Sequence, residues 1–403
     1  RNTRVFIDPT VSATIYGPSV STDMRQLTIG GDATGNNGVA TLSLNGGTIN
    51  VTGVAGQFTT ITAKGVLTGD GRINGAVVNQ GTVNAVNLTL AGGLVNTGTV
   101  TGNGMLNTSL TNAAGGVVRA GAGQVLSLSG AAHSNAGSVE LLNGGELRVQ
   151  GGFSNAAGGR VILNNGTARF ADGLANAGQL QVTFGGGSVF GALSTTQGGK
   201  IILSGNSNTT FYDPVEIQTG GELRTAAGST AVFFGQVSQR TGSMFTGVGT
   251  KFYEGGLHVG ASPGFGVDAG DVHFGSANVF SLDIGGTTAC TAACATDVAL
   301  KNSSYGRYVV NGRLSLGGTL KLGSWMGFVA QAGESFSLLS WGSVSGSFDS
   351  IDASGLMLAQ GTALDASRLA IDGSVRVVAV PEPASWAMWL AGMAGLAVGR
   401  GRL

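Results

Sequence analysis

The densest group of side chains able to do chemistry lies between residues 258 and 273, where two histidines flank two aspartates: His258, Asp268, Asp271 and His273. Imidazole and carboxylate groups could act together in hydrolysis or hold a metal ion if they faced one another. The same segment contains a turn-forming Ser-Pro-Gly sequence, so we expect a solvated loop with neither a metal nor a cofactor. The third histidine, His133, stands alone and is expected at a corner of the chain.

The two cysteines, Cys290 and Cys294, lie close together in a loop rich in threonine and alanine. In an oxidising exterior, such a pair is expected to form a local disulfide that closes a small ring. A metal site would need at least one or two further ligands, and Asp297 is the only nearby candidate. The sequence therefore favours the disulfide over the metal site.

Carboxylates in the middle of the chain could support a carbohydrate-active enzyme, because lyases and hydrolases need clustered or paired acids with a basic residue near the substrate. The acids between residues 65 and 257 are widely spread, however, and Asp213 with Glu216 is the one close pair. We expect these two to be solvated acids of a turn around Pro214. A polysaccharide lyase or hydrolase remains the alternative to a structural protein.

Aromatic residues recur in this part of the chain and could form a platform for sugars or an internal stack on successive repeats. Core packing is the favoured prediction, because buried aromatic rings gain most from contact with one another. The residues concerned are Phe211, Tyr212, Phe233, Phe234, Phe252 and Tyr253.

The composition is that of a folded chain with little charge. Charged residues make up 10% and glycine 73 of 403 residues, whereas hydrophobic residues reach 42% and the formal net charge is zero. Disordered chains usually combine low hydrophobicity with high net charge, so this chain should fold. A net charge of zero gives no electrostatic reason to expect binding to nucleic acid.

A repeat of about twenty residues runs through the body of the chain. Each repeat opens with glycine, any residue and an apolar residue, and successive repeats are 17 to 22 residues apart. An asparagine or glutamine often precedes the glycine by two positions, as at Asn79, Asn96, Asn135, Asn176 and Gln197. The glycine and apolar pairs are Gly81/Val83, Gly98/Val100, Gly116/Val118, Gly137/Val139, Gly159/Val161, Gly178/Leu180, Gly199/Ile201, Gly221/Leu223 and Gly242/Met244.

A period of this length is typical of solenoids. Within each repeat, short runs alternate between apolar and polar residues, which places one side chain inward and the next outward along a strand. Asn-Gly and Gly-Gly pairs separate the runs, and both residue types tolerate the left-handed backbone of tight corners. The predicted fold is all-β: a parallel β-helix, or β-solenoid, with a C-terminal β module and a short C-terminal hydrophobic helix.

Changes in the pattern divide the chain into five parts. Residues 1–64 are predicted to form an N-terminal β cap, 65–257 the regular coils and 258–278 a turn-rich break. Residues 279–378 have longer strand-like runs and form a C-terminal β module, which either continues the solenoid or folds as a small sandwich. Residues 379–403 form a separate tail.

The tail combines three features in a fixed order. Pro381, Glu382 and Pro383 precede an uncharged apolar run from Ala384 to Val398, and Arg400 and Arg402 follow it. Terminal arginines resist translocation, so the pattern indicates a membrane stop with the body of the protein outside. As a helix, the run would rise about 22 Å, less than the roughly 30 Å hydrocarbon core, and a buried C-terminal helix is the alternative.

This ordered set resembles the PEP-CTERM sorting signal of Gram-negative bacteria. The resemblance implies that Pro381, Glu382 and Pro383 are recognised by exosortase, a membrane transpeptidase, which removes the hydrophobic part and leaves the body at or beyond the cell surface. The body also resembles the β-helical passenger segments of autotransporter adhesins, in phrases such as Val78 to Val83. The chain starts at Arg1 without an apolar leader, so a secretory signal peptide is expected outside this sequence.

Together these features predict an exported, non-enzymatic protein of the cell surface or the biofilm matrix, transiently anchored in the membrane by its tail. Its role would be structural or adhesive, with exosortase as a partner and extracellular polysaccharide as a ligand. Weak contacts repeated along a stiff rod would supply the binding strength.

Overall fold

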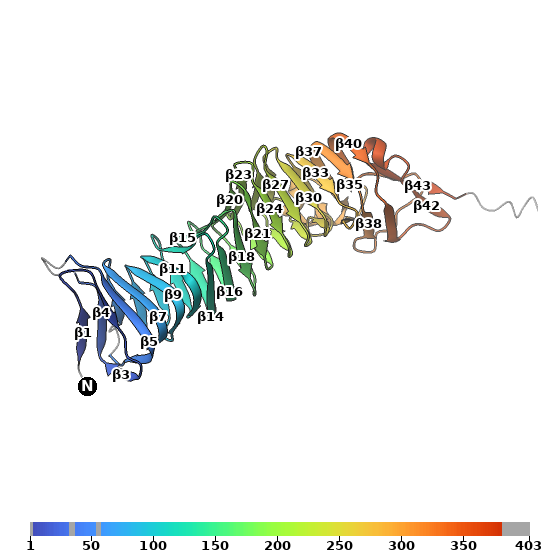
Figure 1. Ribbon diagram of the computed structural model, residues 1–403. Coiled ribbons are helices and arrows are strands. Elements are labelled where there is room, and N and C mark those ends of the chain that lie inside the picture. Colours follow the sequence, from blue (N-terminus) through green and yellow to red (C-terminus); the bar gives the residue numbers. More distant parts are fainter. Residues whose placement is uncertain (1–2, 32–36, 54–57, 381–403) are drawn as a thin grey trace, which may run out of the picture.

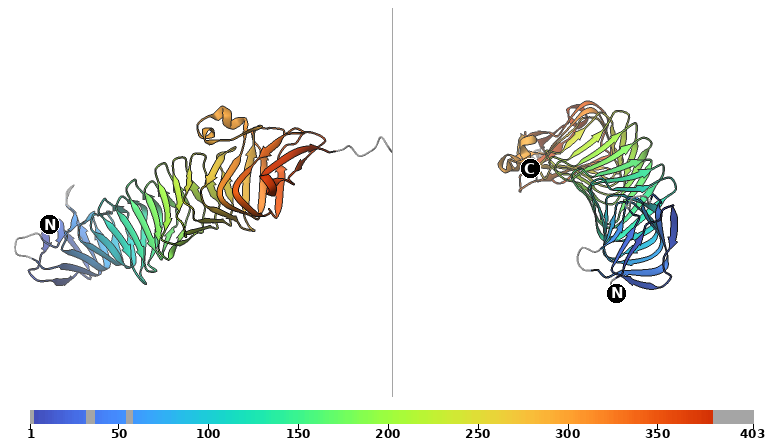
Figure 2. Two further views of the ribbon diagram at one scale, coloured as in Figure 1. Left: turned by 90° about the horizontal axis from the view of Figure 1, so that it is seen from above. Right: turned by 90° about the vertical axis from the view of Figure 1, so that its left-hand side faces the viewer.

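The computed structural model describes residues 3–31, 37–53 and 58–380. Their strands stack one above another along a long rod that runs from the N-terminal to the C-terminal end (Figures 1 and 2). Nearly all of the strands belong to one continuous sheet, in which the strands of successive coils pair in parallel. The predicted all-β parallel β-helix is therefore confirmed.

Each coil contributes to three faces of the solenoid, which we call the first, second and third face. Strands confined to the first face are β2 (Ala13–Tyr16), β13 (Val117–Ala120), β15 (Ser138–Leu142), β17 (Arg160–Asn164), β20 (Gln179–Thr183), β23 (Lys200–Ser204), β26 (Glu222–Thr225), β29 (Met244–Thr246) and β32 (Phe265–Asp268). Strands confined to the second face are β3 (Ser21–Met24), β18 (Gly166–Phe170), β21 (Gly186–Phe190), β24 (Asn208–Phe211), β27 (Thr230–Phe233), β30 (Thr250–Tyr253) and β33 (Asp271–Phe274).

The third face is made mostly of very short strands. These are β1 (Arg4–Ile7), β4 (Gln26–Ile29), β6 (Thr59–Ile61), β8 (Val77–Asn79), β10 (Leu94–Asn96), β12 (Leu110–Asn112), β19 (Leu174–Asn176), β22 (Leu193–Thr195), β25 (Val215–Ile217), β28 (Val237–Gln239), β31 (Leu257–Val259), β34 (Val279–Ile284), β38 (Thr319–Ser324) and β41 (Ser350–Gly355).

Several longer strands bend from one face to the next, and the pairing register of most of them shifts at the bend. Bent strands of the first and second faces are β5 (Ala40–Val51), β7 (Gly65–Asn74), β9 (Thr82–Leu90), β11 (Thr99–Asn107), β37 (Arg307–Leu316) and β40 (Leu339–Gly346). Those of the second and third faces are β14 (Val125–Asn135) and β16 (Glu146–Asn155).

The repeat seen in the sequence corresponds to one buried column on the first face. The apolar residue of each motif pairs with that of the next coil, from Val83 to Leu223, and none of these side chains is more than 1% exposed. The last motif is an exception. Met244 is 45% exposed, and Phe245 takes the column position beside Leu223. In that coil the inward position therefore comes one residue later in the chain than the apolar residue of the glycine motif.

The corners use the residue types that the sequence indicates. Between β15 and β16, Asn143 has φ 55° and Gly144 has φ 88°. This backbone is costly for most side chains, whereas asparagine and glycine adopt it readily. The corner therefore turns the chain without strain and starts the next strand on the second face.

A ladder of buried asparagines lies inside the third face. Except in the last member, each side-chain amide nitrogen donates to the amide oxygen of the next coil at 2.6–2.8 Å, and the side chains are at most 1% exposed. We call this column the asparagine ladder: Asn79, Asn96, Asn112, Asn135, Asn155 and Asn176. Gln197, which the repeat pattern also singled out, is exposed in a turn, and Thr195 takes the next ladder position.

Parallel pairing extends beyond residues 65–257 in both directions. At the N-terminal end β1 pairs with β4 and β2 with β5, and at the C-terminal end β38 pairs with β41 and β37 with β40. Within the described residues, the C-terminal module thus continues the solenoid rather than forming a sandwich. A separate antiparallel sheet is made of β39 (Ser335–Ser337), which precedes β40 in the chain, β42 (Thr362–Asp365) and β43 (Ser374–Ala379).

Helical structure is scarce. The described residues contain η1 (Ala292–Ala295), α1 (Val298–Asn302) and α2 (Leu369–Asp372). In the described ranges, none of these helices is long and apolar enough to cross a membrane. The hydrophobic helix predicted between Ala384 and Val398 lies outside the described residues.

Candidate binding groove

A groove runs along the third face over several coils. It consists of two adjoining hollows of about 650 Å³ and 500 Å³, which share Glu216 and Arg240. Sites that bind small molecules usually have volumes of this order. Because the hollows share two lining residues, we treat them as one feature and call it the third-face groove.

Small outward side chains form the floor of the third-face groove. Ser154, Ala175 and Ser194 occupy equivalent positions on β16, β19 and β22. Their neighbours on either side in the sequence point inward, because side chains alternate along a strand. Side chains this short leave room for a ligand to approach the backbone of the sheet.

The charges around the groove are balanced. Glu216 and Arg240, on adjacent coils, form an ion pair with 2.6 Å between Oε1 and Nε, and both side chains are about one third exposed. Asp172 lines the first hollow and Lys301 the second. With two acids and two bases, the groove has no strong field that would select a polyanionic ligand.

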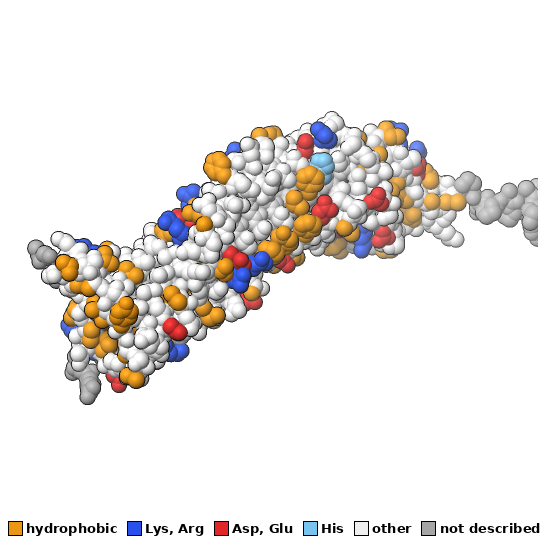
Figure 3. Space-filling model, viewed as in Figure 1, with side chains coloured by type: hydrophobic (Ala, Val, Ile, Leu, Met, Phe, Trp, Pro, Cys, Tyr) orange, Lys and Arg blue, Asp and Glu red, His pale blue; other side chains and the backbone are white. Residues whose placement is uncertain are grey.

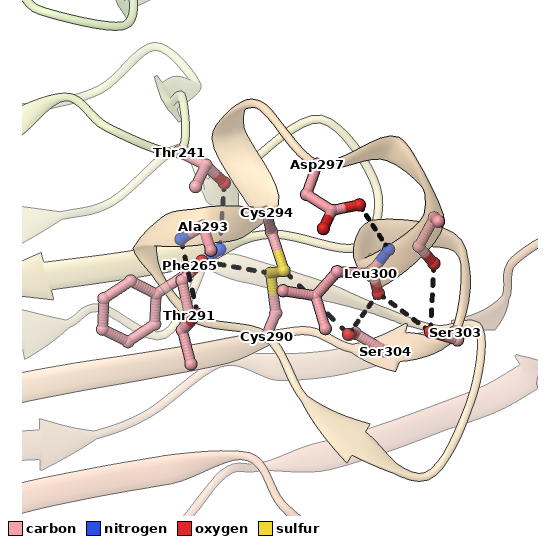
Figure 4. Close-up of a disulfide and its surroundings, with 11 residues drawn as sticks. Thr241, Phe265, Cys290, Thr291, Ala293, Cys294, Asp297, Leu300, Ser303 and Ser304 are labelled. Carbon is pink, nitrogen blue, oxygen red and sulfur yellow. Dashed lines mark hydrogen bonds between the residues drawn. A yellow bond between two sulfur atoms is a disulfide. The ribbon is translucent and has the colours of Figure 1, made fainter.

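A small arm closes one side of the second hollow. It spans η1 and α1 between β35 (Thr288–Ala289) and β36 (Ser304–Tyr305), and α1 projects from the side of the rod in Figure 2. A disulfide joins Cys290 to Cys294 at the base of η1 (Figure 4). The carboxylate of Asp297 accepts the backbone N–H of Leu300 at 2.9 Å and so caps α1.

The histidine and aspartate cluster does not form one site, and the prediction of a solvated loop is wrong for its four members. All four lie on strands: His258 on β31, Asp268 on β32, and Asp271 and His273 on β33. His273 stacks on Phe252 with 4.5 Å between ring centroids. Asp271 accepts the backbone N–H of Arg313 at 2.8 Å. Asp268 is buried completely in the core.

The close acids Asp213 and Glu216 point to different hollows. Asp213 accepts the backbone N–H of Gly191 at 2.7 Å and lines a separate depression of about 390 Å³ beside Arg169. Glu216 is held by Arg240 in the third-face groove. Each acid therefore has a partner, and the two do not form the convergent pair that glycoside hydrolysis uses.

The predicted internal aromatic stack exists, but only half of its members belong to it. Phe211, Phe233 and Tyr253 stack inside the solenoid with centroids 5.0 and 5.4 Å apart. Tyr212 and Phe234 face outward instead and are 41% and 53% exposed. Alternation along each strand explains the difference, because neighbouring residues must point to opposite sides.

The outer aromatic column continues from Tyr212 to Phe190, with ring centroids 4.1 Å apart and planes 3° apart. The guanidinium of Arg169 covers the other face of Phe190 at 3.8 Å. Hydrophobic side chains form an oblique band over these second-face strands (Figure 3). Since the rings cover one another's faces, little ring face is left for a sugar, and the column mainly supports the sheet.

The core contains an ion pair that sequence reasoning missed. Lys251 Nζ lies 2.7 Å from Asp268 Oδ1, and both side chains are fully buried. Burial raises the pKa of the Asp268 carboxyl, while the nearby Lys251 opposes this shift. The alternation of inward and outward side chains along β30 could have indicated the buried lysine. Lys251 falls between the outward residues Thr250 and Phe252 and is therefore at an inward position.

His133 is buried within β14, and its prediction as a corner residue is wrong. Its Nδ1 lies 3.3 Å from the backbone N–H of Leu110, and its Nε2 lies 3.0 Å from the carbonyl of Gln150. Only neutral imidazole can accept at one nitrogen and donate at the other. Burial accordingly lowers the pKa of His133, and it also lowers those of the other two histidines.

Acidification from pH 7.5 to 5.5 is expected to destabilise the fold. The unfolded histidines take up protons as the pH falls below about 6.5, whereas the folded ones resist protonation. For the buried His133 this can cost up to about 1.4 kcal/mol per pH unit in this window. Thermal unfolding at the two pH values measures the effect. A His133→Gln variant should lose less stability than the wild type between the two pH values. An equal or larger loss of stability would contradict the role of buried, neutral His133 in this pH dependence.

Residues of the predicted sorting tail, namely Pro381, Glu382, Pro383, Arg400 and Arg402, lie outside the described residues. Within the described ranges, no group of three or more His, Cys, Asp or Glu side chains is placed to hold a metal ion. No family model matches this chain, and no curated protein matches it.

Proposed function

We propose that this chain is an exported, non-enzymatic β-solenoid, displayed at or released from the surface of a Gram-negative bacterium as a structural or adhesive component of the extracellular matrix. The observation that carries the proposal is the continuous parallel ladder from β1 to β41, with a groove of short outward side chains along one face. A rod of this kind suits the display of repeated weak contacts.

The ligand that fits the third-face groove best is a neutral polysaccharide. The groove is elongated, and its charges balance. Its polar groups, among them Ser194, Gln218 and Thr219, offer hydrogen bonds of the kind that sugar hydroxyls make. A polyuronate would instead require an excess of basic groups, because its own charge must be compensated.

Filling the groove is expected to weaken polysaccharide binding. Ser194→Trp would place a large ring on the floor, whereas Ser188→Trp would place it on the second face of the same coil, where the side chain also points outward. We expect at least about a tenfold weaker affinity for a neutral β-glucan from the first variant only, equivalent to about 1.4 kcal/mol. Affinity electrophoresis measures how strongly each of the two variants binds a neutral glucan, with alginate as the polyuronate for comparison.

Equal binding by the two tryptophan variants would contradict the groove as the binding site. The enzymatic alternative would replace our proposal if the wild type released reducing ends or unsaturated products from the glycan and Glu216→Gln abolished that release. Product analysis of the same incubations by mass spectrometry decides between binding and cleavage.

Surface location is proposed from the tail and its resemblance to exosortase substrates. In an exosortase-positive host, the wild type is expected to lose the residues after the motif and to leave the membrane. A variant with Pro381→Ala, Glu382→Ala and Pro383→Ala is expected to stay intact in the membrane fraction. Mass spectrometry of the C-terminus with cell fractionation tests this, and an intact wild-type C-terminus would overturn sorting while leaving the groove experiment valid.

A further inference from the structure

The buried pair of Lys251 and Asp268 stands out within an apolar core. Lys251 occupies an inward column of the second face between Ala231 and Val272. Asp268 occupies an inward column of the first face, on the coil after that of Lys251, where it follows Phe245. Both side chains are 0% exposed, so the amine and the carboxyl meet in a site without bulk water.

Two tyrosines and one backbone amide complete the surroundings of the carboxyl. The hydroxyls of Tyr253 and Tyr308 each lie 3.5 Å from Asp268 Oδ2, and the N–H of Gly270 donates to Oδ1 at 3.1 Å. Burial raises the pKa of both tyrosines well above the usual value, so they stay protonated and can act as donors. The two carboxyl oxygens thus differ: Oδ1 faces the amine and Oδ2 faces two hydroxyl donors.

We propose that Lys251 and Asp268 condense spontaneously to an isopeptide bond, a covalent cross-link between successive coils of the solenoid. The two groups are already in contact at 2.7 Å, which is the proximity that makes intramolecular reactions fast. Burial raises the pKa of the Asp268 carboxyl, which favours the carboxylic acid form that an amine can attack.

The reaction balances without any co-reactant. A proton passes from the ammonium of Lys251 to Oδ1 of Asp268, which leaves an amine and a carboxylic acid. The nitrogen then attacks Cγ and forms the new C–N bond, while negative charge collects on Oδ2 and is stabilised by the hydroxyls of Tyr253 and Tyr308. A second proton moves from the nitrogen to Oδ1, the Cγ–Oδ1 bond breaks, and one water molecule leaves.

The cross-link would join β30 to β32 through two residues that are 17 positions apart in the sequence. It would join two coils just before the chain leaves the rod to form the disulfide-bearing arm. The bond does not depend on the proposed function, since it requires only the folded core.

Intact-mass spectrometry of the full, reduced chain after folding tests the proposal. The wild type is expected to be lighter than its sequence by one water molecule and to yield a branched peptide that contains both Lys251 and Asp268 after proteolysis. Asp268→Asn is expected to lose ammonia instead of water. The double variant Lys251→Met with Asp268→Val should have its full sequence mass.

Two results would overturn the cross-link. One is a wild-type protein that is folded by circular dichroism, has been incubated for days, and retains the full sequence mass. The other is a loss of water that peptide mapping assigns to cyclised Asp-Gly sequences, of which Asp70-Gly71, Asp172-Gly173 and Asp372-Gly373 are present. Both results are measured on the wild-type chain alone, so the test of the cross-link does not depend on whether a variant folds.

Discussion

Lys251→Met is expected to destabilise the protein by about 3–5 kcal/mol, because it leaves the carboxyl of Asp268 buried without its cation. Asp268→Val should be similarly harmful, because the ammonium of Lys251 would then be buried alone. The double variant removes both charges, and its apolar side chains suit the neighbouring columns. We therefore expect it to be more stable than either single variant, a strongly non-additive result.

The pH dependence of Lys251→Met provides a second signature. Burial already raises the pKa of the Asp268 carboxyl before any cross-link forms, and removal of the cation raises this pKa further. An unfolded carboxyl ionises above about pH 4, whereas the buried one resists ionisation, so the variant should lose stability as the pH rises from 4.

Guanidinium denaturation at pH 4 and pH 8 measures the stability of the two single variants and the double variant. The conservative control is Lys321→Met, which removes a lysine from an outward position of β38 and should cost little. Additive losses, or single variants as stable as the double variant, would contradict the role of a buried pair.

Asn135→Ala is expected to cost about 1–3 kcal/mol, because it interrupts the asparagine ladder at a fully buried position. Asn135 donates to Asn155 at 2.8 Å and to the carbonyl of Arg160 at 3.1 Å, and it accepts from Asn112 at 2.7 Å. Alanine replaces none of these bonds. Since each coil contacts mainly its neighbours, the loss of protection should be concentrated in the coils on either side.

Ser134→Ala is the matched control for the ladder. Ser134 precedes Asn135 on β14 and points to the other side of the sheet, so its truncation should stay within about 0.5 kcal/mol. Hydrogen exchange of both variants shows which amides lose protection. Uniform loss along the whole rod, or no difference between the variants, would argue against a local stabilising role of the ladder.

Local sequence pattern predicted much of the fold correctly. Alternation of apolar and polar residues, with glycine and asparagine at corners, identified the parallel β-helix and most of the inward column from Val83 to Leu223. The pattern failed where a corner changed length. At Met244 the core position moved one residue along the chain, and at Gln197 the glutamine fell in a turn instead of the ladder.

By itself the sequence determined the all-β solenoid, the inward and outward alternation and the chemical character of the corners, because these depend on neighbouring residues in the chain. Only the tertiary structure decided which side chains of different coils meet. Lys251 reaches Asp268, the close acids Asp213 and Glu216 separate into two hollows, and the aromatic residues divide into an inner and an outer column. These contacts depend on the lengths of the corners, which set the register of each coil against the next, and no local pattern contains that information.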